Sequence, residues 1–485
     1  MRMPVIKASV GGRPVAGRVM SLRVAMRLSQ PAQAEIALAP HDNPHGNPHG
    51  NPHDNEWPLD QSLSIEVDGQ ALFAGEVTAV ELVSGPGSER VCLLRGYDRL
   101  HRLRKRQEPR VFENVTVADL ARALTADLGL TVEAERTGGR IERLVQHRQS
   151  DWELLTQAAG RAGLYIVLSG QTLRLRGLKP HGEPIKLTLG DNLWRATAEH
   201  NRERAIEAVT AIGWHPRKGE FVTEKAGSGK QSRTLVDQPM ALLGDAPRAA
   251  VEAGAARAIR IEGVAEGNAR LQAGCAVALS GLDTTIDGLY ALGEAVHEVN
   301  VDGYHVMVCT DPPQIDGPQP SASITLGRVT DVSDPDGAGR VEVSLPAYAD
   351  VNAGWLPVLC PGAGPGKGVV AMPDPDDLVV VALPHGDPAE GLVLGSVFGT
   401  QTAPEKGRHW ILHSGAGQVI VLDDDRKAIK LSNADGSCLD LAPDAVTLTA
   451  RTDMVIEAPG HHLNIRAANI DFDRAPLPVP DGLTP

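Results

Sequence analysis

The chain has few aromatic residues, few cysteines and no long apolar run. Aromatic residues make up 3% of its 485 residues, so any core must be built mainly from Leu, Val, Ile and Ala. Five scattered cysteines without a C-x-x-C pair predict reduced thiols in a protein made in the cytoplasm. No apolar stretch approaches the roughly 20 residues of a membrane span. The N-terminal segment MRMPVIKASV also lacks the apolar region of a signal peptide.

An excess of positive charge is also missing. Lys and Arg number 47 against 61 Asp and Glu, which gives a formal net charge of −14. Nucleic acids and anionic membranes are bound through basic surfaces, so the charge argues against both as stable partners. The 51 glycines and 35 prolines favour turns and short strands. Together these numbers predict a mainly β protein with minor α content, in about three domains.

The chain does contain a repeat of eight residues. It starts at Cys438 and runs for five units to Leu477. Each unit opens with about four residues that alternate apolar and polar, as in a very short strand, and closes with a polar, small or Pro/Gly break. Such strands cannot bury a face alone, so we expect three chains to wind together into a stiff β-prism needle. An ordinary β-meander is the alternative. The predicted trimer core consists of Val446, Leu448, Met454, Ile456, Leu463, Ile465, Ile470 and Phe472.

The repeat is irregular in one respect. Apolar residues hold positions one and three in the unit of Val446 and Leu448, but positions two and four in the unit of Leu439 and Leu441. A shift of one position turns a strand's face over. Either the prism twists between units, or some of these pairs face outward.

The remaining sequence divides by pattern into several regions. Residues 1–100 predict a β-domain, 101–180 a mixed α/β region, 181–315 a second β-rich region, 316–323 a Pro-rich linker, 324–399 a small OB-type barrel, 408–475 the needle, and 476–485 a Pro-rich tail. Capping signals predict helices at Thr116–Leu128 and Ser150–Ala162, and a third helix is expected at Ala249–Arg260. Gly219–Arg233 is interpreted as a loop. The cluster Arg99–Arg110 is interpreted as a solvated loop or a partner-facing patch.

Candidate chemical sites are weak. Gly362–Gly368 (GAGPGKG) and Gly227–Lys230 (GSGK) lack the spacing of a phosphate loop. Asp423–Asp425 is most simply a solvated turn. His461 and His462 are adjacent, so in a strand they face opposite ways and do not form a paired metal site. The tandem N-P-H-G repeat at 41–55 allows either a metal site or an expanded surface loop. The sequence therefore predicts no catalytic residue, no cofactor and no metal site.

Residues of the OB region carry a family resemblance. The text GRVTDVSDPDGAGRVEVSLP, followed by W-x-P-V and MPDPDDLVVVALPHGDPAEGLVLGSVFG, closely resembles the OB domain of contractile-injection spike proteins, the family of phage baseplate protein V and the VgrG proteins. Phe112–Leu178 resembles the hub domain of the same proteins, the late control protein D type. Ile411–Asp424 resembles the start of their needle. The resemblance covers most of the chain in the order hub, OB domain, needle. It implies that residues 1–100 and 181–315 form two tube-like β-barrels of the hub.

This resemblance implies a structural, non-enzymatic role. A homotrimeric hub and needle would adapt the inner tube to a three-fold spike and puncture the target envelope. The implied partners are the inner tube protein, baseplate proteins, a PAAR-type tip protein and effector cargo, with transient contact to the target membrane. The protein would be made in a bacterial cytoplasm and act in a phage tail-like particle. Some relatives carry an enzyme, and a cell-wall-degrading tail enzyme is the alternative. However, the eight residues Thr400–Gly407 and the twelve residues Arg474–Pro485 are too short for a catalytic domain.

Overall fold

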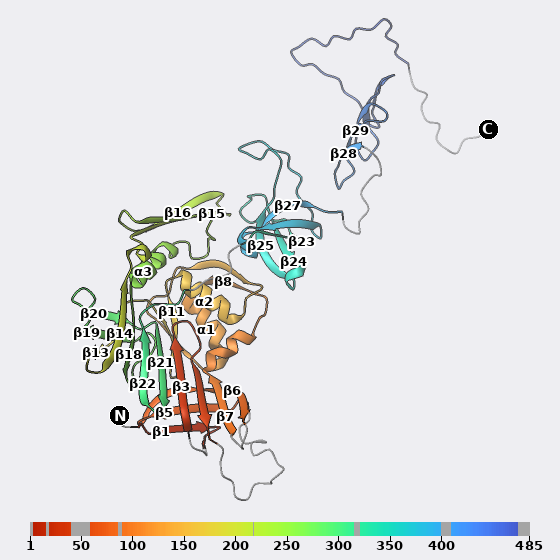
Figure 1. Cartoon of the computed structure of the whole chain (residues 1–485). Coiled ribbons are helices and arrows are strands. Elements are labelled where there is room, and N and C mark those ends of the chain that lie inside the picture. Colours follow the sequence, from red (N-terminus) through yellow and green to blue (C-terminus); the bar gives the residue numbers. More distant parts are fainter. Residues whose placement is uncertain are drawn as a thin grey trace, which may run out of the picture. The chain divides into compact units, whose positions relative to one another are not determined.

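The structure, a computed structural model, describes residues 3–15, 19–39, 59–85, 90–216, 218–314, 321–398 and 409–473 (Figure 1). The chain separates into two compact units, 1–397 and 398–485, and each is described by itself. The histidine-rich segment 41–55 and the tail 476–485 lie outside the described residues, so what the sequence predicts for them stays a prediction.

The largest sheet of the first unit has eleven strands. Their order is β14-β18-β22-β21-β3-β4-β7-β6-β5-β1-β2. Their bounds are β1 Ile6–Val10, β2 Arg13–Pro14, β3 Val19–Arg27, β4 Gln33–Leu38, β5 Ser62–Val67, β6 Gln70–Ser84, β7 Arg90–Tyr97, β14 Leu193–His200, β18 Ile259–Glu266, β21 Glu294–Asn300 and β22 Gly303–Cys309. Strand β5 illustrates the alternating pattern that forms this sheet. Leu63, Ile65 and Val67 are buried, and the residues between them are exposed. The mainly β fold class is confirmed.

Residues 3–314 are here called the hub. Strands from its early and late parts meet in this sheet. β21 pairs antiparallel with β3, so that Val299 lies opposite Leu22. Figure 1 shows the green strand β21 beside the red β3. A smaller sheet is formed by β13 Ile185–Thr188, β19 Ala276–Ser280 and β20 Gly288–Ala291. Its Leu187 and Val277 join the same aliphatic core, so segments almost 300 residues apart in sequence share one buried cluster.

Two helices form the centre of the mixed region. They are α1 Val117–Thr125 and α2 Asp151–Arg161, and both sequence predictions are confirmed. Thr116 with Asp119, and Ser150 with Glu153, each make a complete capping box. The helices pack with a cluster of buried aliphatic side chains. Around them lie η2 Arg99–Lys105, β8 Arg110–Val115, η3 Ala126–Leu128, β9 Thr131–Ala134, β10 Ile141–Gln146, β11 Tyr165–Ser169 and β12 Thr172–Arg176.

A three-stranded sheet and a helix complete the hub, with two differences from the sequence prediction. The elements are η4 Arg202–Arg204, β15 Ala208–His215, β16 Glu220–Gly227, β17 Ser232–Leu235 and α3 Ala246–Ala258. The loop predicted at Gly219–Arg233 is wrong, because β16 pairs with β15 along its whole length. Cross-strand pairing there outweighs a composition that favours turns. Helix α3 starts earlier than predicted and ends at Ala258, because Ile259 already belongs to β18.

Residues 321–398 form a five-stranded barrel. Its strands are β23 Ser323–Asp331, β24 Arg340–Leu345, β25 Val351–Pro357, β26 Leu378–Leu383 and β27 Leu392–Ser396, in the order β25-β24-β23-β26-β27. A bridge between Val358 and Val393 brings the two end strands together. Short 3-10 turns lie at η5 Pro346–Tyr348, η6 Pro384–Gly386 and η7 Pro388–Glu390. Residues Lys367–Ala371 form no strand, and Lys367 closes a tight turn with Gly364.

The second unit contains an antiparallel meander, here called the spike sheet. Its strands are β28 His409–His413, β29 Val419–Asp423, β30 Ala428–Ser432, β31 Cys438–Leu441 and β32 Val446–Thr449, paired in sequence order. The first two eight-residue units thus begin with a strand, as predicted. Residues 450–473 are described and contain no strand in the single chain.

Candidate spike surface and hub–barrel joint

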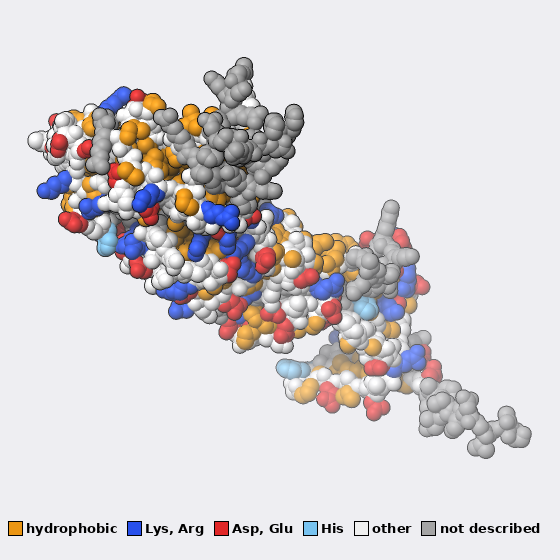
Figure 2. All heavy atoms as spheres, turned by 90° about the horizontal axis from the view of Figure 1, so that it is seen from below, with side chains coloured by type: hydrophobic (Ala, Val, Ile, Leu, Met, Phe, Trp, Pro, Cys, Tyr) orange, Lys and Arg blue, Asp and Glu red, His pale blue; other side chains and the backbone are white. Residues whose placement is uncertain are grey.

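The basic cluster Arg99–Arg110 is part of the hub's internal structure. Asp98 caps the 3-10 helix η2 by accepting the Leu100 N–H, and Leu100 and Leu103 are buried. The loop interpretation is therefore wrong. The arginines pair within the chain, as in Arg102 with Glu76. On the face seen in Figure 2, Lys and Arg side chains lie among Asp and Glu side chains. Arg102, Arg106 and Arg110 of the cluster are thus paired with carboxylates of their own fold.

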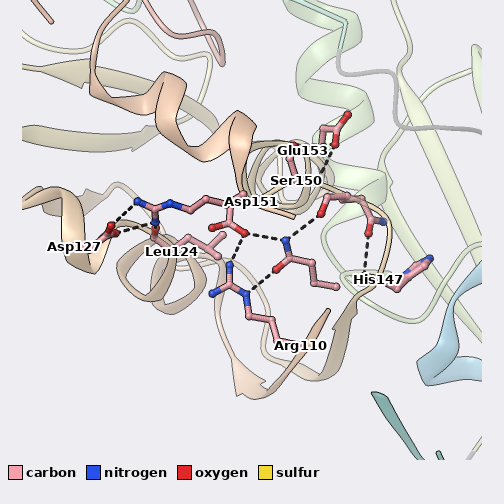
Figure 3. Close-up of polar contacts among 10 residues, drawn as sticks. Arg110, Leu124, Asp127, His147, Ser150, Asp151 and Glu153 are labelled. Carbon is pink, nitrogen blue, oxygen red and sulfur yellow. Dashed lines mark hydrogen bonds and ion pairs between the residues drawn. The ribbon is translucent and has the colours of Figure 1, made fainter. Parts of the chain in front are cut away.

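One arginine of this cluster enters a buried polar network. Figure 3 shows the Arg110 guanidinium pointing at the carboxylate of Asp151, the first residue of α2. Asp151 and Gln146 are both fully buried. The Gln146 side chain accepts a hydrogen bond of 2.9 Å from Arg110 and donates one of 2.8 Å to Asp151. A carboxylate at a helix N-terminus is favoured by the helix dipole, so the network fixes β8 and β10 against α2.

The β8–β10 ribbon also contacts the barrel. Val145 of β10 is part of the barrel's buried cluster. The Arg143 guanidinium donates a hydrogen bond of 2.6 Å to the Asn352 carbonyl oxygen of β25. The Arg148 guanidinium lies over the Tyr348 ring, 5.6 Å from its centroid. The hub and the barrel are therefore joined by shared apolar packing as well as by polar contacts.

The turn at Pro384–Glu390 brings titratable groups to this joint. His385 Nδ1 lies 3.0 Å from Glu390 Oε2, and His385 Nε2 lies 3.1 Å from Asp237 Oδ1 of the hub. Glu390 also accepts a hydrogen bond of 2.6 Å from the Met240 N–H. Burial raises the pKa of Asp387, although the Ala389 N–H opposes the shift. Burial and the nearby Asp387 raise the pKa of Glu390.

The hairpin between β23 and β24 depends on one ion pair. Arg340 and Asp334 each have a side chain that is 4% exposed, and they are in contact through two nitrogens of the guanidinium. Asp334 also accepts the backbone N–H groups of Asp336 and Ala338. Hydrogen bonds from Arg340 hold the pKa of Asp334 well below its ordinary value. The residues DPDGAGR are therefore a structural unit of the barrel.

The spike sheet has one continuous apolar face. Side chains directly opposite each other in an antiparallel pair lie on the same face. The register therefore gives two cross-strand rows, Trp410–Leu422–Ile429–Leu441–Val446 and Leu412–Ile420–Leu431–Leu439–Leu448. Trp410 is 77% exposed and Leu448 59% exposed. This face has no covering layer among the described residues of its unit.

The register resolves the irregularity of the repeat. Leu439 pairs with Leu448, and Leu441 pairs with Val446. The hairpin reverses the chain, so the shift from positions two and four to positions one and three keeps both apolar pairs on one face. The predicted trimer core omitted the eight apolar residues of this face that precede Val446, although Leu439 and Leu441 were named in the repeat. Apolar residues at every second position of WIL, VIVL and AIKL were the available signal for the other six.

The eight predicted trimer-core residues are all exposed in the single chain, from 48% for Met454 to 91% for Phe472. Val446 and Leu448 lie in β32, whereas the other six lie in the segment 450–473 without strands. The single chain therefore does not bring these six together.

The other candidate sites have ordinary structural roles. No helix follows the glycines of Gly362–Gly368, so no helix N-terminus faces them. In the loop after β16, the Lys230 N–H donates to the Glu207 carboxylate, which occupies the place a phosphate would need. Asp423–Asp425 ends β29 and begins an exposed turn, and His461 and His462 are exposed. Among the described residues, no three His, Cys, Asp or Glu side chains gather as a metal ion requires. Nor does that part of the chain contain a helix long and apolar enough to span a membrane.

Comparison with known proteins agrees with this architecture. Residues 325–398 match the family described as the type VI secretion system/phage-baseplate injector OB domain. Residues 59–238 match a second family, the Alg8 N-terminal domain, over less than half of the chain. No curated protein sequence matches the chain.

Solved structures resemble much longer parts of the chain. A type VI secretion component of Escherichia coli, described as similar to T4 bacteriophage tail proteins, is 12% identical and covers 80% of this chain and 99% of its own, with a TM-score of 0.57. A chain of the Francisella PdpA–VgrG complex is 8% identical and covers 93% of this chain and 88% of its own, with a TM-score of 0.58. A prophage tail protein of Shewanella oneidensis is 14% identical and covers 64% of this chain and 99% of its own, with a TM-score of 0.51. The barrel at 325–398 is thus an injector OB domain of the type VI secretion and phage-baseplate family, and the chain has the fold of the VgrG and phage-tail hub proteins.

Proposed function

We propose that this chain is the structural hub-and-spike protein of a contractile injection system. The observation that carries the proposal is the position of the injector OB barrel, which follows a hub of the phage-tail fold and precedes a sheet with an unpartnered apolar face. In this role the hub adapts the inner tube to a three-fold spike, and the spike concentrates the force of contraction on a small area of the target envelope.

The proposed partner of the apolar spike face is the same surface on two further copies of the chain. Three identical faces can close around a three-fold axis and leave no face exposed. The proposed core is continued by the eight residues from Val446 to Phe472 named above. A trimer would carry a net charge of about −42, three times −14, which favours solubility of an elongated particle.

The other proposed partners follow from the family resemblance. They are the inner tube protein, baseplate proteins, a PAAR-type tip protein and effector cargo, with brief contact to the target membrane during puncture. The protein would accordingly reside in an assembled tail-like particle.

The test is the mass of the purified full chain in solution. Light scattering should give three times the 51.4 kDa chain mass, independent of dilution in the micromolar range. A stable, well-folded monomer contradicts the proposal. Incubation of the same preparation with peptidoglycan should leave its turbidity unchanged, because the proposed role requires no hydrolysis. Clearing of the suspension would favour the alternative of a cell-wall-degrading tail enzyme.

A further inference from the structure

The spike sheet and the segment after it differ in structure although they share an apolar alternation. In β28–β32 the alternating residues form paired strands within one chain. In 450–473 the alternation continues through Met454, Ile456, Leu463 and Ile465, but the described residues contain no strand. The apolar pattern alone therefore does not determine whether a strand forms.

Local turns explain why the spike sheet forms within one chain. Ser414 and Gln418 close the first hairpin, since the Ser414 N–H donates to the Gln418 carbonyl at 2.9 Å. Asn433 and Ser437 close the third hairpin in the same way at 3.0 Å. The Ala442 N–H closes the last hairpin on Ala445 at 2.9 Å. Contacts between residues close in sequence form at low entropic cost, so this sheet needs no partner to begin.

The two faces of the spike sheet differ in charge. None of the ten residues in its two apolar rows is charged or polar. The opposite face carries Lys430 and Asp440, which lie opposite each other in the register, and Arg426 lies 3.3 Å from Asp440. Only the apolar face can therefore be buried against an identical copy without enclosing charge.

The sequence offers no covering layer for this face from the preceding segment. Residues 399–408 read GTQTAPEKGR and contain no large apolar side chain. A second copy of the chain, in contrast, brings an apolar face of the same size and chemistry. An exposed apolar patch of this extent generally marks a protein–protein interface.

We infer that the apolar face of β28–β32 is the surface on which copies of the chain first dock, and that residues 450–473 become strands only on the assembled copies. This inference rests on the proposed trimer and adds an order of events. The preformed sheets associate first. The short strands of the later repeats then gain the interchain hydrogen bonds that a single chain cannot supply.

Three full-length variants test this order. Leu431→Asp places a carboxylate at the centre of one apolar row. Ser432→Asp is the matched control, since it adds the same charge at the next residue, on the opposite face. Ile456→Asp places the charge in the later segment. Light scattering measures the mass, and hydrogen exchange measures protection in each segment.

The wild type and Ser432→Asp should be trimers with slow exchange throughout 409–473. Leu431→Asp should be a monomer in which 450–473 exchanges freely, while the first unit keeps wild-type protection. Ile456→Asp should remain trimeric, with protection retained in β28–β32 and reduced at least about tenfold in 450–473. Leu422→Asp, in the other apolar row, should behave as Leu431→Asp does.

The inference is overturned if Leu431→Asp and Leu422→Asp remain trimers, or if Ile456→Asp alone is monomeric, because the later repeats would then initiate association. It is also overturned if 450–473 is protected in a monomeric variant. A monomeric wild type contradicts the proposed function itself, so the two failures are distinguishable.

Discussion

At the scale of single residues, the barrel hairpin depends on one nearly buried carboxylate. Asp334 accepts hydrogen bonds from the Arg340 side chain and from two backbone N–H groups of the turn. Asp334→Ala removes all of these acceptors and leaves the Arg340 charge 4% exposed with only Asp336 as a partner. We expect the free energy of unfolding to fall by about 1–3 kcal/mol at pH 7.

The effect of Asp334→Ala should depend on pH. The folded pKa of Asp334 is depressed, so its contribution is present above the unfolded value near pH 4 and is lost as pH falls further. The free energies of unfolding of wild type and variant should therefore begin to converge as pH falls below 4. Asp336→Ala is the control, because Asp336 is 53% exposed and should contribute at most about 1 kcal/mol. An equal loss in both variants would contradict the special role of Asp334.

At the scale of elements, the start of α2 can be tested through its cap. Ser150→Ala removes the acceptor for the Glu153 N–H, and we expect a loss of about 1 kcal/mol. Ser150→Thr is the matched control, since its hydroxyl can still accept this bond. Hydrogen exchange in the first turn of α2 should rise about fivefold in Ser150→Ala and stay near wild type in Ser150→Thr. Equal exchange in the two variants would show that the cap is dispensable.

The contact between β10 and β25 can be tested at Gly354. This glycine has a φ of +85°, and an added Cβ would lie 3.2 Å from the Arg143 guanidinium. Gly354→Ala should therefore strain the backbone and also displace Arg143 from the Asn352 carbonyl. Gly337→Ala is the control, because its φ is +63° but its added Cβ would meet no atom within 4 Å.

Both glycine variants should lose about 1 kcal/mol from backbone strain. Gly354→Ala should lose at least about 1 kcal/mol more, measured by thermal unfolding, from the lost Arg143 contact. Equal losses would mean that the Arg143 contact adds nothing to stability.

Local signals were sufficient to predict the two capped helices. Thr116 with Asp119 and Ser150 with Glu153 act within one turn, so sequence spacing specifies them. The pairing of β21 with β3 could not be predicted, because it joins residues 294–299 to residues 22–27 and no local rule encodes it. β16 was missed for a related reason, since it is paired by its neighbour β15, whereas the residues GSGKQS at its end and beyond suggested a loop. In the spike, alternation predicted which residues are apolar on one face, whereas the hairpin register decided which pairs share it.

At the scale of the whole molecule, cooperative unfolding of the hub and the barrel depends on the contacts between them. Two carboxyl groups at that interface, Asp387 and Glu390, have pKa values raised by burial. A raised folded pKa in an acid means that stability is highest below the unfolded value near pH 4. This contribution is then lost as pH rises through the folded pKa. The first unit should accordingly lose stability as pH rises above the unfolded value near pH 4.

Glu390→Gln tests this pH dependence. Its amide oxygen can still accept the Met240 N–H, but it carries no charge to desolvate. The variant should therefore melt at the same or a higher temperature than wild type at pH 8, and its melting temperature should fall less between pH 5 and pH 8. Asp387→Asn added to Glu390→Gln should flatten the dependence further, because burial also raises the pKa of the Asp387 carboxyl group. The contrary outcome is that Glu390→Gln keeps the full wild-type dependence of melting temperature on pH and melts at a lower temperature than wild type at pH 8. That result would mean that His385 stabilises the ionised Glu390 and that burial does not penalise it. In that case the contact of His385 with Glu390 favours the ionised carboxylate within the barrel's turn at neutral pH.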